Sequence, residues 1–178
     1  MSALTPDETI LGLLAAQPQH GYQLLDCFNR PQQLGLVWKL STSQLYAVLK
    51  RLERLGWICG TEQASETAPP RVAYAITAAG RNVLDAWLNE LNPSPSVRRV
   101  RVEFLSRLYI AHLLGRPIQP IVSYQRQSCL RDRARIEAMQ VGIAPSVGQL
   151  AADMMSTQLD ALLGWIDRCE AALSSVEA

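Results

Sequence analysis

The apolar residues of this 178-residue chain recur mostly at every third or fourth position, the spacing that places them on one face of an α-helix. An exception lies between residues 57 and 76. There Val72, Tyr74 and Ile76 alternate with small residues, after a β-rich stretch and a polar loop with two prolines, which is the pattern of a hairpin. The first half therefore predicts four helices, over residues 5–17, 20–29, 41–55 and 77–91, and one hairpin, over residues 57–76.

Short polar residues mark where several of these helices begin. Ser41 is followed three residues later by Gln44, and Thr5 by Glu8, which are the pairs of residues that form a capping box. Gly56 follows the third helix and suits the residue just beyond a helix end. We therefore expect the third helix to begin at Ser41 and to end at Gly56.

The order of helix, strand, loop and strand from Leu40 to Thr77 is that of a winged helix-turn-helix. The apolar residues of the third helix cluster in one arc, and polar and basic residues occupy the opposite arc and its flanks. A helix fits the DNA major groove, where base edges can be distinguished, and basic side chains contact phosphates. The residues expected to contact DNA are Ser41, Thr42, Ser43, Gln44, Tyr46, Lys50, Arg51, Arg54 and, at the base of the wing, Arg71.

The wing loop, residues 64–70, contains Glu66 and lacks a basic residue, so whether it touches DNA stays open.

The second half is helical beyond a Pro- and Ser-rich linker, residues 92–96. We expect a mainly α fold, with a winged helix domain over residues 1–91, a small β-hairpin wing, and an α-helical dimerisation domain over residues 97–178. The last helix has a broader apolar face than one small domain can cover, which predicts a partner helix. The residues assigned to this homodimer interface are Phe104, Leu108, Leu150, Met154, Leu159, Leu162 and Ile166.

The net charge of +1 changes the picture of the DNA-binding surface. Residues 1–96 carry seven Lys and Arg against eight Asp and Glu, a net charge of −1. Any charge that attracts DNA must therefore be local, and it gathers at Lys39, Lys50, Arg51 and Arg54, opposed only by Glu53. The weak charge also motivates an alternative, in which the winged helix binds another protein and little DNA.

Several other classes of protein find little support. No apolar run reaches the roughly 18 residues of a membrane span, and the first residues lack a signal-peptide pattern, so we expect a cytoplasmic protein without a membrane partner. The four cysteines lack metal-site spacing, and catalytic motifs are missing. We expect no enzyme activity, no metal and no cofactor. A redox-sensing cysteine and a second basic patch on the arginines of residues 120–140 stay open.

Three segments together resemble the PadR family of transcriptional regulators. Ile10 to Leu25 is similar to the family's apolar helix followed by His-Gly-Tyr. Trp38 to Ile58 is similar to the family's recognition-helix pattern. Arg71 to Leu84 is similar to the segment that closes the family's wing. Arg101 to Leu114 looks like the start of the C-terminal helices of the family's larger subgroup.

The resemblance implies a homodimeric repressor in which each winged helix reads half of an inverted-repeat operator in double-stranded DNA. It places Ser43, Tyr46 and Lys50 against the DNA. It also implies release by a small hydrophobic or phenolic effector. Trp38, Trp87 and Trp165 are candidates for the effector pocket, although tryptophans more often anchor a core or an interface.

Overall fold

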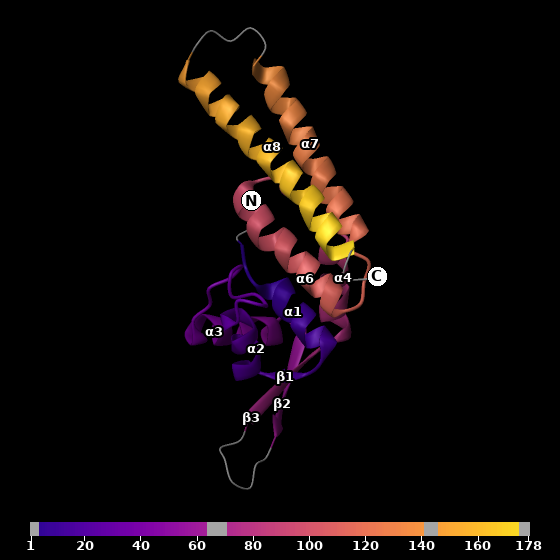
Figure 1. Cartoon of the computed structure of the whole chain (residues 1–178). Coiled ribbons are helices and arrows are strands. Elements are labelled where there is room, and N and C mark those ends of the chain that lie inside the picture. Colours follow the sequence, from indigo (N-terminus) through magenta and orange to yellow (C-terminus); the bar gives the residue numbers. More distant parts are fainter. Residues whose placement is uncertain (1–3, 64–70, 141–145, 175–178) are drawn as a thin grey trace. The chain divides into compact units, whose positions relative to one another are not determined.

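The structure is a computed structural model that describes residues 4–63, 71–140 and 146–174 (Figure 1). It is mainly helical with one small sheet, as the sequence predicts. The elements are α1 (Asp7–Ala16), β1 (Gln19–His20), α2 (Gly21–Asn29), α3 (Thr42–Arg54), β2 (Ile58–Gln63), β3 (Arg71–Ile76), α4 (Ala78–Leu88), α5 (Val97–Arg99), the π-helix η1 (Val100–Phe104), α6 (Leu105–Leu113), α7 (Gln119–Gln140) and α8 (Val147–Ser174).

The chain forms two compact units. The first comprises Met1–Asn89 with Leu105–Pro117, and the second comprises Glu90–Phe104 with Ile118–Ala178. This grouping differs from the linear division at residues 92–96, because α6 packs on α1 of the first unit. Amphipathic spacing shows that a helix buries one face, but it does not show which neighbour covers that face.

The sheet has three antiparallel strands in the order β1-β3-β2. The predicted hairpin is the pair β2–β3, which in Figure 1 extends away from α1, α2 and α3 of its own unit. Its predicted loop, with Glu66, lies outside the described residues. The two-residue strand β1 pairs Gln19 with Tyr74 and His20 with Ala73. It was not predicted, because two residues are too few to show a period of two.

The ends of α3 confirm the predicted local signals. The Ser41 hydroxyl accepts a hydrogen bond from the Gln44 backbone N–H at 3.2 Å, and the Ser41 N–H donates to Gln44 Oε1 at 2.9 Å. Gly56 has a φ of 70°, a left-handed conformation that residues with a Cβ rarely adopt. Both ends of α3 are thus set by residues within a few positions of the helix itself.

The start of α1 differs from the prediction. Pro6 occupies the N-cap position and makes no side-chain cap hydrogen bond, so the predicted capping by Thr5 is wrong. Asp7, the first helical residue, instead forms a bidentate ion pair with Arg51 of α3. Arg51 Nε donates to Asp7 Oδ2 at 3.2 Å. The Asp7 side chain is only 11 % exposed, so the pair anchors α3 to α1 at the edge of the core.

Helix α1 lies at the centre of the first unit and is buried on almost every side. Ile10, Leu11, Leu13 and Leu14 are at most 2 % exposed. Helices α4 and α6 and strand β3 cover it. Gly12 permits the close approach of α6, since a Cβ at this position would lie 2.4 Å from Ile110 Cγ2.

In the second unit, α7 and α8 lie side by side (Figure 1). Ion pairs connect them, because Arg126 contacts Asp167 at 2.8 Å and Glu170 at 2.6 Å, and Arg133 contacts Asp160 at 3.0 Å. Both carboxylates that contact Arg126 raise the pKa of its guanidinium. Arg126 and Arg133 thus bridge the two helices, and Arg135 pairs with Asp132 of its own helix. These ion pairs leave the arginines of α7 poorly suited to a second basic patch.

An apolar stripe at helical spacing, formed by Val100, Phe104, Leu108 and Ala111, is buried throughout, with exposed fractions of at most 5 %. It does not run along one regular helix, however. The π-helix η1 lies between α5 and α6, where the sequence predicted continuous α-helical spacing. A π-turn inserts one residue into the helical repeat, and the apolar stripe alone does not reveal it.

We expect Gly12→Ala to destabilise the protein by a net amount of about 1 kcal/mol or more in chemical denaturation, because Ile110 is fully buried and has no room to move. Gly164→Ala in α8 is the matched control. The nearest atom to its added Cβ is 3.9 Å away, so the better helix propensity of alanine should stabilise the protein by about 0.5–1 kcal/mol. Equal effects of the two substitutions would contradict the close packing of α1 on α6.

We expect Asp7→Asn to lower the free energy of unfolding by about 1–3 kcal/mol, because it leaves the partly buried Arg51 guanidinium without its carboxylate. Asp26→Asn removes the exposed pair with Arg30 and should cost at most about 0.5 kcal/mol. Urea titrations of the two variants measure the difference. An equally small loss for both would show that the Asp7–Arg51 pair is not an anchor.

Candidate nucleic-acid interface

The two faces of α3 differ as the sequence predicts. Leu45, Val48, Leu49 and Leu52 are at most 6 % exposed and bind the helix to its own unit. The opposite face is exposed to solvent. It presents Ser41, Thr42, Ser43, Gln44, Tyr46, Lys50 and Arg54.

The first turn of α3 presents hydroxyl and amide groups in a fixed arrangement. Ser41 Oγ lies 3.0 Å from Ser43 Oγ, in addition to its bond with the Gln44 backbone. The cap uses the oxygen of the Gln44 side-chain amide, and its NH2 group remains a donor for another partner. Thr42 and Ser43 are exposed beside it. These groups suit hydrogen bonds with base edges.

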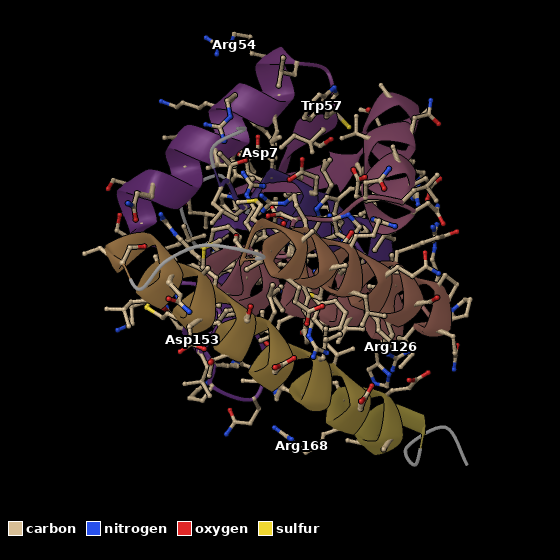
Figure 2. All side chains as sticks on the ribbon, turned by 90° about the horizontal axis from the view of Figure 1, so that it is seen from above. Asp7, Arg54, Trp57, Arg126, Asp153 and Arg168 are labelled. Atoms are coloured by element: carbon tan, nitrogen blue, oxygen red, sulfur yellow. The ribbon has the colours of Figure 1, made fainter. Side chains whose placement is uncertain are left out.

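The basic residues of α3 fall into two groups. Lys50 and Arg54 are exposed, and Figure 2 shows the Arg54 side chain extending away from the ribbon. Arg51, predicted to contact phosphate, instead pairs with Asp7, which Figure 2 shows next to α3. This pairing favours an anchoring role for Arg51 over the predicted phosphate contact. Sequence spacing could not reveal it, because the two residues are 44 positions apart.

The end of α3 is also joined to the hairpin. Glu53, the acidic residue of the basic cluster, accepts a hydrogen bond from the Gly60 N–H of β2 at 3.0 Å. The Glu53 carboxylate therefore holds the wing against α3. With Arg51 paired, the exposed cations among the predicted DNA contacts and the basic cluster are Lys39, Lys50, Arg54 and Arg71.

A hollow of about 480 Å³ lies between α2, α3 and β3 in the first unit. Its lining includes Tyr46 and Arg71, two predicted DNA contacts that are distant in sequence. The Arg71 Cζ atom lies 5.6 Å from the ring centroid of Tyr22. Tyr74 also lines the hollow. Burial is the main cause that raises the pKa of its phenol, and the nearby Glu53 and Tyr46 raise this pKa further. The phenol of Tyr74 therefore stays neutral around pH 7.

The three tryptophans assigned to an effector pocket each have a packing partner. Trp38 Nε1 donates to the Ser106 hydroxyl at 2.9 Å. The Arg107 guanidinium lies 5.5 Å from the Trp87 ring centroid, and Trp165 packs edge-on against Phe104 at 5.9 Å. These contacts favour the alternative interpretation of the tryptophans as anchors.

A second hollow, of about 400 Å³, lies between α1, α2 and α6. Burial raises the pKa of the Cys27 thiol and of the Tyr109 phenol, and both groups line this hollow. Leu13 and Leu113 add apolar surface, and Arg30 lies at the same hollow. Asp26, which pairs with Arg30, also lines it, so the charges of the wall are balanced. Apolar and polar walls of this size suit a small organic molecule. The sequence did not predict this grouping.

The residues predicted to form the dimer interface divide into two groups. Phe104, Leu108, Leu159 and Ile166 are at most 5 % exposed within the single chain, so their burial does not need a second copy. Leu162 is half-buried. The N-terminal half of α8 is different. Leu150 is 71 % exposed and Met154 57 %, and Val147 and Met155 lie beside them with large exposed fractions.

None of the helices in the described part of the chain combines the length and the apolar character that a bilayer crossing requires.

Comparison with known proteins agrees with this arrangement. Residues 10–86 match the family described as the transcriptional regulator PadR-like family. This match covers most of α1, all of α2, α3 and the strands of the hairpin, and most of α4. It therefore includes every residue predicted to contact DNA.

Two relatives are similar in sequence. The negative transcriptional regulator PadR of Bacillus subtilis is 32% identical over 107 residues, which are 60% of this chain and 57% of that protein. A probable transcriptional regulator of Mycobacterium tuberculosis is 33% identical over 86 residues, 48% of this chain and 44% of that protein. The chain thus spans about half the length of the relatives it matches.

Two solved structures are similar over almost the whole chain. Bacillus subtilis PadR in complex with operator DNA has a TM-score of 0.47 and 22% identity, and the match covers 93% of this chain and 96% of that chain. The same protein in complex with p-coumaric acid has a TM-score of 0.43 and 21% identity, with 95% and 98% covered. The family match and the relatives in sequence place residues 10–86, the winged-helix part of this chain, in the PadR-like family of transcriptional regulators.

Proposed function

We propose that the chain is a sequence-specific DNA-binding transcriptional regulator that acts as a homodimeric repressor. The observation that carries the proposal is the exposed polar and basic face of α3, whose opposite face is buried and whose end is joined to the hairpin. The match of residues 10–86 to a family of transcriptional regulators supports it. The name of the Bacillus subtilis relative, a negative regulator, supports repression over activation.

In this proposal α3 enters the major groove. Thr42, Ser43 and the amide NH2 of Gln44 meet base edges at the start of the helix. Lys50 and Arg54 contact phosphates on the exposed face of α3, and Tyr46 and Arg71 do so from the hollow beside the wing. Arg51 acts indirectly, because its pair with Asp7 holds α3 in place.

Two copies are needed for useful affinity, since the first 96 residues have a net charge of −1, from seven Lys and Arg against eight Asp and Glu. We assign the second copy to the exposed apolar residues at the start of α8, including Leu150 and Met154. A dimer of this kind would read two half-sites about 34 Å apart, or a multiple of that distance. Because such a regulator acts on DNA inside the cell, a cytoplasmic location belongs to the same proposal.

Lys50→Ala should weaken binding to every DNA sequence by a similar factor, because phosphates are the same in all sequences. We would measure anisotropy with a labelled duplex from the region upstream of the chain's own gene and with a shuffled duplex, over a range of salt. The slope of log affinity against log salt should become shallower by about 0.9 for each phosphate that the variant no longer neutralises.

Arg81→Ala is the matched control, because Arg81 is an exposed arginine of α4 that is not among the proposed DNA contacts. It should leave both the affinity and the slope unchanged. If the unmodified protein at micromolar concentration binds neither duplex in a salt-dependent way, DNA binding is wrong. Binding to a co-purifying protein in its place would establish the alternative of a protein-interaction module.

We further propose that a small hydrophobic or phenolic effector releases the DNA. The hollow beside Cys27 and Tyr109 has a suitable size and a mixed apolar and polar lining. It supports an effector site better than the separately packed tryptophans do.

Leu113→Trp should fill part of this hollow, since Leu113 lies at its edge and is 41 % exposed. We expect p-coumaric acid to lower the DNA affinity of the unmodified protein and to have little effect on the variant, which should bind DNA normally without the effector. Leu36→Trp, at an exposed position outside the hollow, is the control. An equal response of both variants would exclude this hollow as the effector site.

A further inference from the structure

Three consecutive residues at the junction of β1 and α2, His20, Gly21 and Tyr22, surround the hollow that holds Tyr46 and Arg71. None of the three was predicted to contact DNA. We infer that His20-Gly21-Tyr22 is a positioning segment, which holds the Tyr46 phenol and the Arg71 guanidinium where they can bind a DNA phosphate. This inference rests on the proposed function, because it concerns how two of the proposed contacts are placed.

Tyr22 supports Arg71. The guanidinium carbon lies 5.6 Å from the centroid of the Tyr22 ring, within the distance of a cation–π interaction. Tyr22 is 50 % exposed, so burial in the core does not explain its aromatic side chain. An exposed arginine side chain otherwise samples many rotamers, and contact with a ring face reduces that freedom. Tyr22 therefore orders the cation at the base of the wing before DNA arrives.

His20 joins this support to the wing. Its Nδ1–H donates to the Val72 carbonyl at 2.9 Å, since a carbonyl oxygen can only accept. Its ring stacks on Tyr22, with the centroids 5.6 Å apart and the planes 10° from parallel. Val72 directly follows Arg71 in β3. The imidazole therefore connects the backbone beside Arg71 to the ring that Arg71 contacts.

Gly21 makes room for Tyr46. A Cβ at residue 21 would lie 2.8 Å from the Tyr46 hydroxyl and 2.9 Å from two ring carbons. These atoms are at the far end of a side chain that is 41 % exposed, so the ring could move away at little cost in stability. A larger residue at this position would thus displace the phenol without unfolding the protein.

The segment joins three parts of the unit that come together only in the fold. Tyr46 belongs to α3, Arg71 to β3, and the positioning residues to the start of α2. A phenol hydroxyl and a guanidinium beside one hollow offer neutral and charged donors together. A backbone phosphate of DNA is the anion that this combination suits at an interface with the recognition helix.

The test is a double-mutant cycle with Tyr22→Ala and Arg71→Ala, measured on the upstream and shuffled duplexes over a range of salt. In the unmodified background, Tyr22→Ala should weaken binding about two- to fivefold on both duplexes, the size of an exposed cation–π interaction. In the Arg71→Ala background it should have almost no effect. Tyr22→Phe keeps the ring face and should bind like the unmodified protein, which a direct contact by the Tyr22 hydroxyl would not allow.

Gly21→Ala provides a second cycle. It should weaken DNA binding in the unmodified background and have no effect in the Tyr46→Ala background, where the ring is gone. Thermal unfolding of each variant should show a melting temperature close to that of the unmodified protein. A melting temperature that falls together with DNA affinity would mean that Gly21 has a structural role only.

The outcomes separate the two proposals. If the unmodified protein binds DNA and Tyr22→Ala is equally harmful with and without Arg71, the positioning segment is wrong while the DNA-binding function stands. Loss of binding by Tyr22→Phe as large as that by Tyr22→Ala would also overturn it. If the unmodified protein does not bind either duplex, both the function and the inference are wrong.

Discussion

The arrangement of the first unit depends on the ion pair between Asp7 and Arg51. Helix α3 must present one face to solvent, so only its other face is available to hold it in place. Apolar packing secures that face but is tolerant of small rotations, whereas two charge-assisted hydrogen bonds in a bidentate pair fix direction as well as distance. A carboxylate at the first turn of α1 is favourable for that helix too, because helix N-termini attract negative charge. One residue thereby stabilises the central helix α1 and orients α3.

Features set by neighbouring residues could be predicted from the sequence, and features set by distant residues could not. The cap at Ser41, the turn at Gly56 and the hairpin each depend on a short stretch of chain, and each is present. The role of Arg51 depends on Asp7, and the support of Arg71 depends on Tyr22, in both cases more than 40 positions away. The sequence shows which residues of this surface are basic. It could not separate those that are available for DNA from the one that is already paired.

The apolar pattern of the C-terminal helices shows the same limit. Leu159 and Ile166 lie on the face that was expected to meet a second copy, but they are buried within one chain. Hydrophobic spacing reports that a face is covered and does not report what covers it. Leu150 and Met154 remain exposed, so the surface available for pairing is narrower than the whole face of α8 and lies towards its start. The proposed dimer therefore depends on fewer residues than the pattern suggested.

The capping box at the start of α3 limits how Gln44 can contact a base in the proposed interface. Gln44 uses its amide oxygen to hold the Ser41 N–H, so the orientation of the amide is already determined before DNA binds. A glutamine that grips adenine with both its oxygen and its nitrogen must turn its amide to match the base edge. Here that turn would break a cap, which typically contributes about 1 kcal/mol. We therefore expect Gln44 to act as a one-sided donor that favours purine N7 or guanine O6 and discriminates weakly between the two purines.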